Sequence, residues 1–295
     1  MAHQPYLYLK LLLRDNLLLD LDEYALNDTR QHGLVCSFMG MRLASVFQPI
    51  LGVDGKVAGR EALLRAGLLE HGELAPDAAF EDAVRANRLV QFDRLVRTIH
   101  LLNHTRKFNE YELLFLNVHS HLLTGVSDHG RTFEQILHYY STPTARVVIE
   151  IKEHEVKDDA RLAEAVSNYR SLGYRIAVSG FGTAHSSLER VLKLQPDIVK
   201  MDGALIHTAD NSCNAASSLN KLVNRFHSEG VQVAINGIET ARQLRIARLS
   251  GASLLQGYYL GHPEFSVEKK IHIADDSFRN LKVNKVVNWG LAWMY

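Results

Sequence analysis

Short apolar runs alternate with longer amphipathic stretches along most of the chain, from about residue 44 onward. Each run is rich in Val, Ile, Leu and Phe, as expected of a buried strand. Eight runs occur, at residues 44–51, 56–64, 113–118, 146–151, 174–178, 197–199, 231–235 and 252–255. Helix-like segments separate the later runs, at residues 158–172, 186–194, 215–229 and 240–250. Strands that alternate with helices predict a mostly parallel sheet, and eight strands favour closure into a TIM-like (β/α)8 barrel.

Only three residues, Val53-Asp54-Gly55, separate the first two runs. The Asp-Gly pair favours a tight hairpin because both turn positions tolerate positive φ. So short a loop cannot make the crossover that two parallel strands require. The first strand of the barrel is therefore predicted to run antiparallel to the second.

Segments at both ends lie outside the barrel. Residues 7–24 are rich in leucine at mixed three- and four-residue spacing, which predicts an amphipathic helix. This helix is expected to pack on its own domain or on a dimer mate. The alternative is a helix that lies on a membrane surface. Charged residues interrupt this stretch, so neither a transmembrane segment nor a signal peptide is expected. A closing helix is expected after Phe265, and residues 286–295 carry both tryptophans in a tail that docks on the barrel or on a partner. We divide the chain into a helical lead-in (1–42), a barrel (43–275) and a C-terminal tail (276–295).

Composition narrows the classes of function. The 295 residues include 33 Lys plus Arg and 33 Asp plus Glu, so no basic excess points to nucleic acid. Cys36 and Cys213 lie far apart in the sequence, which argues against a disulfide framework or a thiolate zinc site. A reducing cytoplasm is the expected compartment.

Polar residues stand at the carboxyl ends of the predicted strands, where α/β barrels hold their chemistry. Carboxylates with an amide oxygen form a site suited to magnesium or manganese, and a nearby lysine can activate a water for phosphodiester hydrolysis. The alternative is that these are ordinary strand-end residues facing solvent, but seven strands each contribute one, which favours function. The residues are Glu61, Arg65, Asn117, Glu150, Glu153, Ser179, Gly180, Lys200, Asp202, Asn236, Glu239 and Gln256.

The sequence resembles the EAL domain family, the cyclic di-GMP phosphodiesterases and their inactive relatives, from about Ser45 to Pro263. The matching stretches are Phe47-Gln48-Pro49-Ile50, Glu61-Ala62-Leu63-Leu64-Arg65, Leu116-Asn117-Val118, Glu150-Ile151-Lys152-Glu153, Phe181-Gly182-Thr183, Ser186-Ser187-Leu188, Lys200-Met201-Asp202, Gly237-Ile238-Glu239-Thr240 and Gln256-Gly257-Tyr258. The family's barrel also has an antiparallel first strand, in agreement with the predicted hairpin.

The resemblance implies roles for individual residues. Glu61, Asn117 and Glu150 would be metal ligands, and Lys200 would activate the water. Arg65 would contact a phosphate of cyclic di-GMP. The full implied set of nucleotide contacts is Gln48, Glu61, Leu63, Leu64, Arg65, Asn117, Glu150, Asp202, Glu239 and Gln256.

The sequence departs from the active members of the family at three positions. Two consecutive aspartates of the metal centre are replaced by Ser179 and Gly180, and a glutamate is replaced by Asn236. Three carboxylates are thus missing where two divalent cations would sit, so magnesium or manganese is expected to bind only weakly and no cofactor is required. Glu153 is retained and is expected to anchor the loop after the fifth strand, residues 181–186.

We therefore expect a catalytically inactive EAL-type domain that acts as a cytoplasmic cyclic di-GMP receptor in signalling. The alternative is an adapter that binds a protein partner, or a second copy of the chain, without nucleotide. An active cyclic di-GMP phosphodiesterase is the third hypothesis, and it rests on Glu61, Asn117, Glu150 and Lys200.

Overall fold

The computed structural model describes residues 10–11, 13–15, 23–68, 72–126, 129–183 and 186–265. Eight of its strands close into a barrel in which β11 pairs back with β3, which confirms the predicted fold. In chain order they are β3 (Met41–Gly52), β4 (Val57–Leu68), β6 (Leu113–Asn117), β7 (Val147–Ile151), β8 (Arg175–Phe181), β9 (Ile198–Met201), β10 (Gln232–Ile235) and β11 (Leu254–Leu255). Each of them overlaps one of the eight apolar runs.

The first barrel strand, β3, is antiparallel to both β4 and β11, as the Asp-Gly turn predicts. Gly55 has a φ of 80°, and its amide donates to the Gly52 carbonyl at 2.9 Å. The register of this hairpin sets Gln48 directly opposite Glu61. The turn therefore decides which residue of β3 stands beside the first carboxylate of the site.

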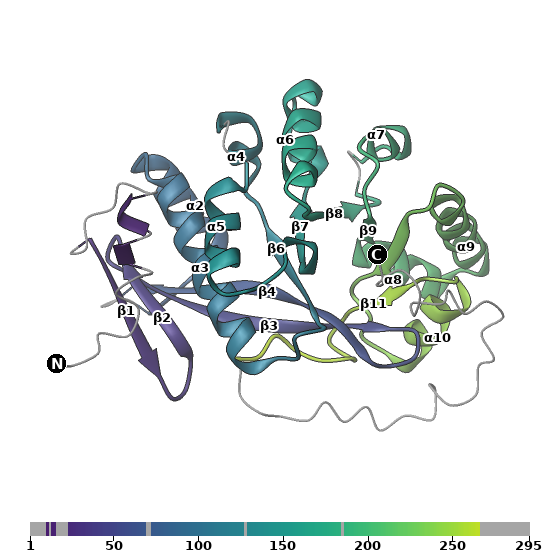
Figure 1. Cartoon of the computed structure of the whole chain (residues 1–295). Helices are drawn as coiled ribbons and strands as arrows, with labels where there is room; N and C mark the ends of the chain where they lie inside the picture. The colour runs from purple at the N-terminus through teal and green to yellow at the C-terminus, as the bar shows by residue number, and fades with distance from the viewer. Residues whose placement is uncertain are drawn as a thin grey trace.

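Helices cover the outside of the barrel (Figure 1). They are α2 (Pro76–Arg85), α3 (Leu89–Lys107), α4 (Ser120–Gly125), α5 (Arg131–Tyr139), α6 (Asp159–Ser171), α7 (Leu188–Lys193), α8 (Gly203–Asn211), α9 (Cys213–Ser228) and α10 (Ala241–Leu249), with 3-10 turns η1 (Thr144–Arg146) and η2 (Glu153–Glu155). The large apolar core lies between these helices and the strands. Among the described residues, no helix combines the length and the apolar character needed to cross a membrane.

A second, smaller apolar cluster fills the barrel interior. Each contributing strand supplies one or two residues to it: Ile50, Leu113, Phe115, Val148, Ala177, Ile198, Ala234 and Leu254. We call this cluster the barrel plug. It closes the interior below the site.

The helical lead-in predicted for residues 1–42 is wrong over its second half. Residues 24–38 form an antiparallel hairpin, β1 (Tyr24–Thr29) and β2 (Gly33–Phe38), and β2 extends the barrel sheet by pairing with β3. Met39 and Gly40, with φ of 54° and 71°, make the two-residue turn with positive φ that suits the twist of paired strands. Residues 10, 11 and 13–15 are helical, and the rest of the predicted helix lies outside the described residues.

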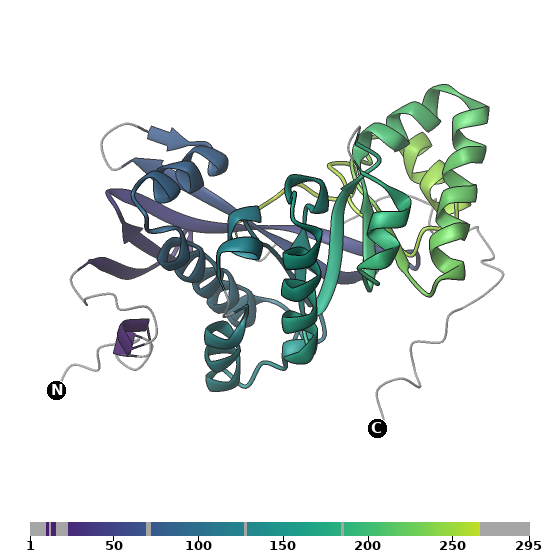
Figure 2. The same cartoon turned by 90° about the horizontal axis from the view of Figure 1, so that it is seen from above.

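This hairpin is fixed to α3. The side-chain amide of Asn103 donates to the Leu34 carbonyl at 2.8 Å and accepts from the Leu34 amide at 2.8 Å. Figures 1 and 2 both place β1 and β2 beside α2 and α3, at the end of the molecule away from α8, α9 and α10. A short edge strand, β5 (Gly72–Leu74), pairs with β4.

The chain returns to β3 at its other end, where Phe47 and Glu264 exchange backbone hydrogen bonds of 2.8 and 3.1 Å. The predicted barrel start at residue 43 falls inside β3. The closing helix predicted after Phe265, the boundary at 275 and the tail at 276–295 lie outside the described residues.

Candidate functional site

A ring of polar side chains stands directly above the barrel plug. On six parallel strands, the residue two positions beyond a plug residue is polar: Asn117, Glu150, Ser179, Lys200, Asn236 and Gln256. Because side chains alternate along a strand, these residues face the same interior as the plug. Antiparallel β3 contributes Gln48, two positions before Ile50, and β4 contributes Glu61 opposite it. The carboxyl ends of the strands therefore meet in one mouth.

Lys200 stands at the centre of this mouth. Its Nζ atom lies 2.8 Å from Oε2 of Glu61 and 2.8 Å from both carboxylate oxygens of Glu150. All three side chains are buried, with Lys200 only 2% exposed. One ammonium from β9 thus joins carboxylates that come from β4 and β7, two strands separated by β6.

Glu61 is bonded from its other sides by amide groups. Asn117 Nδ2 donates to Oε1 at 2.9 Å, and Gln256 Nε2 donates to Oε2 at 2.8 Å. Gln256 also donates to Gln48 Oε1 at 3.2 Å, and Gln48 Nε2 donates to the Gly261 carbonyl at 3.1 Å. The network therefore continues from the carboxylates to the chain segment that follows β11.

Burial and charge act in opposite directions on these groups. For Glu61, burial alone would raise the pKa, but the Lys200 ammonium and three hydrogen bonds lower it. For Glu150, burial and the neighbouring Glu61 charge raise the pKa despite Lys200. Burial would lower the pKa of Lys200, but the two carboxylates outweigh it and raise the pKa to about 12. Lys200 therefore stays a cation throughout the physiological pH range.

The end of β8 brings no carboxylate to the mouth. Ser179 is buried and neutral, and Gly180 has a φ of +72°. A Cβ built on Gly180 would lie 3.3 Å from Cε1 of His154, so this imidazole covers the place where a side chain would project. Asn236 turns its Oδ1 back to its neighbour's backbone, accepting from the Gly237 amide at 2.7 Å.

These residues do not fit a pair of divalent cations. Such a centre needs several carboxylates that bridge and surround two ions. The two carboxylates at this mouth are already bonded to Lys200, and the described part of the chain contains no group of three or more His, Cys, Asp or Glu side chains arranged to hold a metal ion.

The other predicted nucleotide contacts lie around the bonded cluster rather than within it. Arg65 is exposed on β4 beyond the mouth, next to half-buried Leu63 and buried Leu64. Asp202 caps α8, accepting from the Ala204 amide at 2.9 Å. Glu239 is exposed after β10. The structure thus unites Gln48, Glu61, Asn117, Glu150, Lys200 and Gln256, and leaves the remaining five on the rim.

The loop after β8 is tied to the rim of the mouth. Glu153 is completely buried, and its Oε1 accepts a hydrogen bond of 2.6 Å from the Ser186 hydroxyl, as the sequence predicts for an anchor. His154, beside it, was not singled out from the sequence. Its contact with Gly180 depends on the fold of η2, and no motif marks it.

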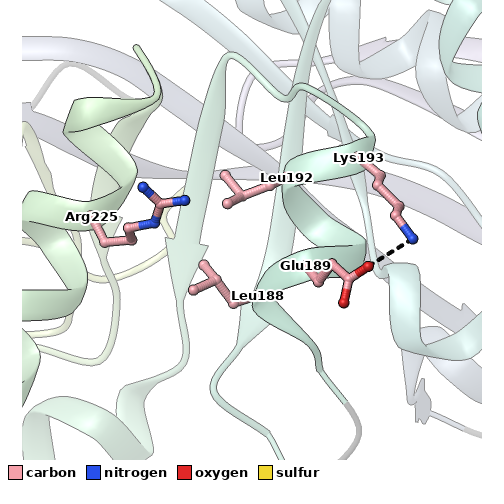
Figure 3. A pocket seen from close by; sticks show the side chains of 5 residues that line it. All are labelled: Leu188, Glu189, Leu192, Lys193 and Arg225. Atoms are coloured by element: carbon pink, nitrogen blue, oxygen red, sulfur yellow. Dashed lines mark ion pairs between the residues drawn. The ribbon is translucent and has the colours of Figure 1, made fainter.

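A separate hollow of about 400 Å³ lies on the outer surface between α7 and α9 (Figure 3). Leu188 and Leu192 form its apolar wall, and the charged Glu189, Lys193 and Arg225 surround them. None of the mouth residues lines it, so we place the candidate site at the mouth.

The fold defines an α/β-barrel protein, and the mouth is its candidate ligand site at the carboxyl ends of the strands. The EAL domain model matches residues 37–263, most of the chain, and the protein belongs to the EAL domain family. The match leaves β1 and most of β2 outside it.

Two relatives illustrate the similarity. The chain is 32% identical over 155 residues to the uncharacterized EAL-domain containing protein YkuI of Bacillus subtilis, covering 51% of this chain and 38% of that protein. It is 25% identical over 215 residues to the probable cyclic di-GMP phosphodiesterase PdeB of Escherichia coli, covering 72% and 41%. The chain therefore spans about two fifths or less of the length of these relatives.

Solved structures share the fold. The structure of YkuI in complex with cyclic di-GMP and calcium has a TM-score of 0.67 and 26% identity, covering 80% of this chain and 59% of that one. The manganese and cyclic di-GMP complex of BlrP1 from Klebsiella pneumoniae has a TM-score of 0.71 at 21% identity, covering 85% and 62%.

Proposed function

We propose that this chain is a cytoplasmic cyclic di-GMP receptor that binds the nucleotide without hydrolysing it. The observation that carries the proposal is the charge of the mouth. Two buried carboxylates remain there, both bonded to Lys200, and β8 ends in Ser179 and Gly180. Metal-assisted hydrolysis depends on carboxylates that hold two ions close together, and this mouth does not offer them.

The same mouth retains groups suited to a nucleotide. Amide side chains of Gln48 and Gln256 are ordered by the hydrogen bonds that link them to Glu61. Arg65 is exposed further along β4, beyond the mouth, and a guanidinium binds phosphate oxygens through charge-assisted hydrogen bonds. EAL proteins of similar fold have been solved with cyclic di-GMP bound, which supports this choice of ligand.

Binding and turnover can be tested with one sample. Calorimetric titration with cyclic di-GMP is expected to show one site per chain in EDTA as well as in manganese. Arg65→Ala should weaken binding about tenfold, because loss of one charge-assisted phosphate contact costs about 1.4 kcal/mol or more. Arg245→Ala removes an exposed arginine on α10 and serves as the matched control.

Two results would contradict this proposal. Absence of binding at tens of micromolar nucleotide would exclude the receptor function. Accumulation of linear dinucleotide with magnesium or manganese, abolished by Glu61→Ala, would establish hydrolysis.

Restoring carboxylates is expected to restore metal binding. Gly180→Asp would strain a backbone with φ of +72° and approach His154, so the better variant is Ser179→Asp with Asn236→Glu. Two added negative charges should tighten manganese binding at least tenfold, since hard cations bind more tightly as ligand charge increases. Equal manganese affinity of the folded variant and the parent would contradict the prediction that missing carboxylates limit metal binding at this mouth.

A protein adapter is the second candidate function, and the β1–β2 hairpin favours it. This hairpin lies largely outside the family match, yet α3 holds it firmly through Asn103. Deleting residues 1–40 would remove buried Leu34 and Cys36 from the core, so single substitutions on exposed positions of β1 are the better test. A partner whose capture survives these substitutions and is insensitive to nucleotide would have to use another surface.

A further inference from the structure

The cation at the centre of the mouth belongs to the protein itself. Lys200 Nζ makes three contacts of 2.8 Å with carboxylate oxygens, two from Glu150 and one from Glu61. This is the space between two acidic side chains in which a hard cation would bind. The ammonium therefore occupies a cation position in the mouth.

We propose that Lys200 acts as a resident cation, which holds Glu61 and Glu150 together without metal and excludes divalent cations from the mouth. A divalent ion would have to displace the ammonium from both carboxylates or share them with it. Displacement would leave a buried ammonium unpaired, and sharing would place like charges side by side in a buried site. Both alternatives oppose metal binding.

Lys200 is enclosed by the barrel around it. It lies on β9, which pairs with β8 on one side and β10 on the other, and its side chain is 3% exposed. Nζ lies 5.9 Å from the centroid of the Phe115 ring, so the plug covers the ammonium from below. An exposed lysine could turn into solvent when a metal ion arrives, whereas Lys200 would have to leave a buried position.

The amides around Glu61 support the same conclusion. Asn117 and Gln256 both turn N–H groups toward its carboxylate. An amide binds a metal ion through its oxygen, whereas the amide groups that face Glu61 here are N–H donors. The shell around the carboxylates is thus arranged for ammonium and amide donors.

Lys200 would exclude metal ions from the mouth before any nucleotide binds, whether or not cyclic di-GMP is the ligand. The test is to measure manganese binding, both by calorimetry and by electron paramagnetic resonance, which detects the manganese that stays free. Lys200→Met removes the charge while keeping an unbranched side chain. Lys221→Met removes an exposed lysine on α9 and is the matched control.

Under identical conditions, the parent protein and Lys221→Met should bind manganese equally poorly. Lys200→Met should gain one manganese per chain with affinity at least tenfold tighter, and Glu150→Gln added to it should abolish that gain. Manganese should also raise the melting temperature of Lys200→Met but not that of the control.

Two results would overturn the inference. The first is a Lys200→Met protein that is folded and binds manganese no better than the parent. The second needs no lysine variant: a parent protein that binds one manganese, lost in Glu61→Gln, would show that Lys200 does not exclude the ion. Nucleotide titration of the parent in EDTA tests the proposed function separately, so the two failures are distinguishable.

Discussion

Replacing Asp93 with alanine is expected to lower the free energy of unfolding by about 3–5 kcal/mol, the usual cost of leaving one member of a buried ion pair without its partner. Asp93 and Arg97 lie one turn apart on α3, and both side chains are almost fully buried, with 2% and 6% of their surface exposed. On a surface, such a pair would contribute little to the free energy of unfolding, because solvent screens the charges. Burial makes it a strong determinant of stability.

Side chains from neighbouring helices keep this ion pair away from solvent. Arg97 lies 5.6 Å from the Phe133 ring centroid on α5, and its Nη1 reaches the Tyr169 hydroxyl on α6 at 3.5 Å. Burial raises the pKa of Asp93 even though Arg97 opposes this change. Three helices therefore meet around one ion pair.

Urea unfolding followed by circular dichroism would measure the effect. Glu189→Ala, which breaks an exposed pair with Lys193, is the control and should leave the free energy of unfolding almost unchanged, because solvent screens this pair. The double variant Asp93→Leu with Arg97→Met should recover most of the loss, because apolar residues replace both charges. A single Asp93→Ala loss as small as that of Glu189→Ala would contradict the assigned burial.

Much of the barrel and its mouth follows from period-two alternation in the sequence. Ile198 and Lys200, or Val148 and Glu150, face one interior because they are two residues apart on a strand. A polar residue two positions after an apolar one, repeated on strand after strand, therefore predicts both the plug and the ring above it.

Alternation does not fix the direction of residues that lie beyond the ends of the strands. Asp202 and Glu239 lie beyond the ends of their strands, where alternation no longer fixes direction. Asp202 instead caps α8, a role that suits the aspartate before a helix. Position at a strand end predicts proximity to the mouth but not membership of the hydrogen-bonded cluster.

The β1–β2 hairpin was missed because leucine spacing dominated the interpretation of the N-terminal segment. The Met39-Gly40 pair signals only the next turn, between β2 and β3, since a glycine in a two-residue loop favours paired strands. The burial of Asp93 and Arg97 could not be predicted in this way. An i, i+4 pair has the same sequence pattern on a surface helix, and only the packing of α5 and α6 buries it.

Acid should destabilise this fold through two buried histidines of α3. Burial lowers the pKa of His100 to about 3, and burial together with Arg146 and Arg60 lowers that of His104 to about 3. In the unfolded chain a histidine titrates near 6.5. Each histidine therefore contributes stability that is fully present above pH 6.5 and is lost as the pH falls toward 3, because only the unfolded state takes up the proton.

The loss amounts to about 1.4 kcal/mol per pH unit for each histidine, or roughly 5 kcal/mol for both between pH 6.5 and 4.5. Urea unfolding at several pH values in this range would measure it. His104→Leu suits the apolar contacts with Phe47 and Phe108, and His100→Gln keeps a polar group near the Ser45 hydroxyl, which bonds His100 at 2.7 Å. Each variant should reduce the slope of the free energy of unfolding against pH by about 1.4 kcal/mol per unit. The control is His138→Gln, at an exposed position, which should leave this slope unchanged. If His100→Gln and His104→Leu gave the same slope as His138→Gln, then protonation of His100 and His104 would not be the cause of the acid destabilisation.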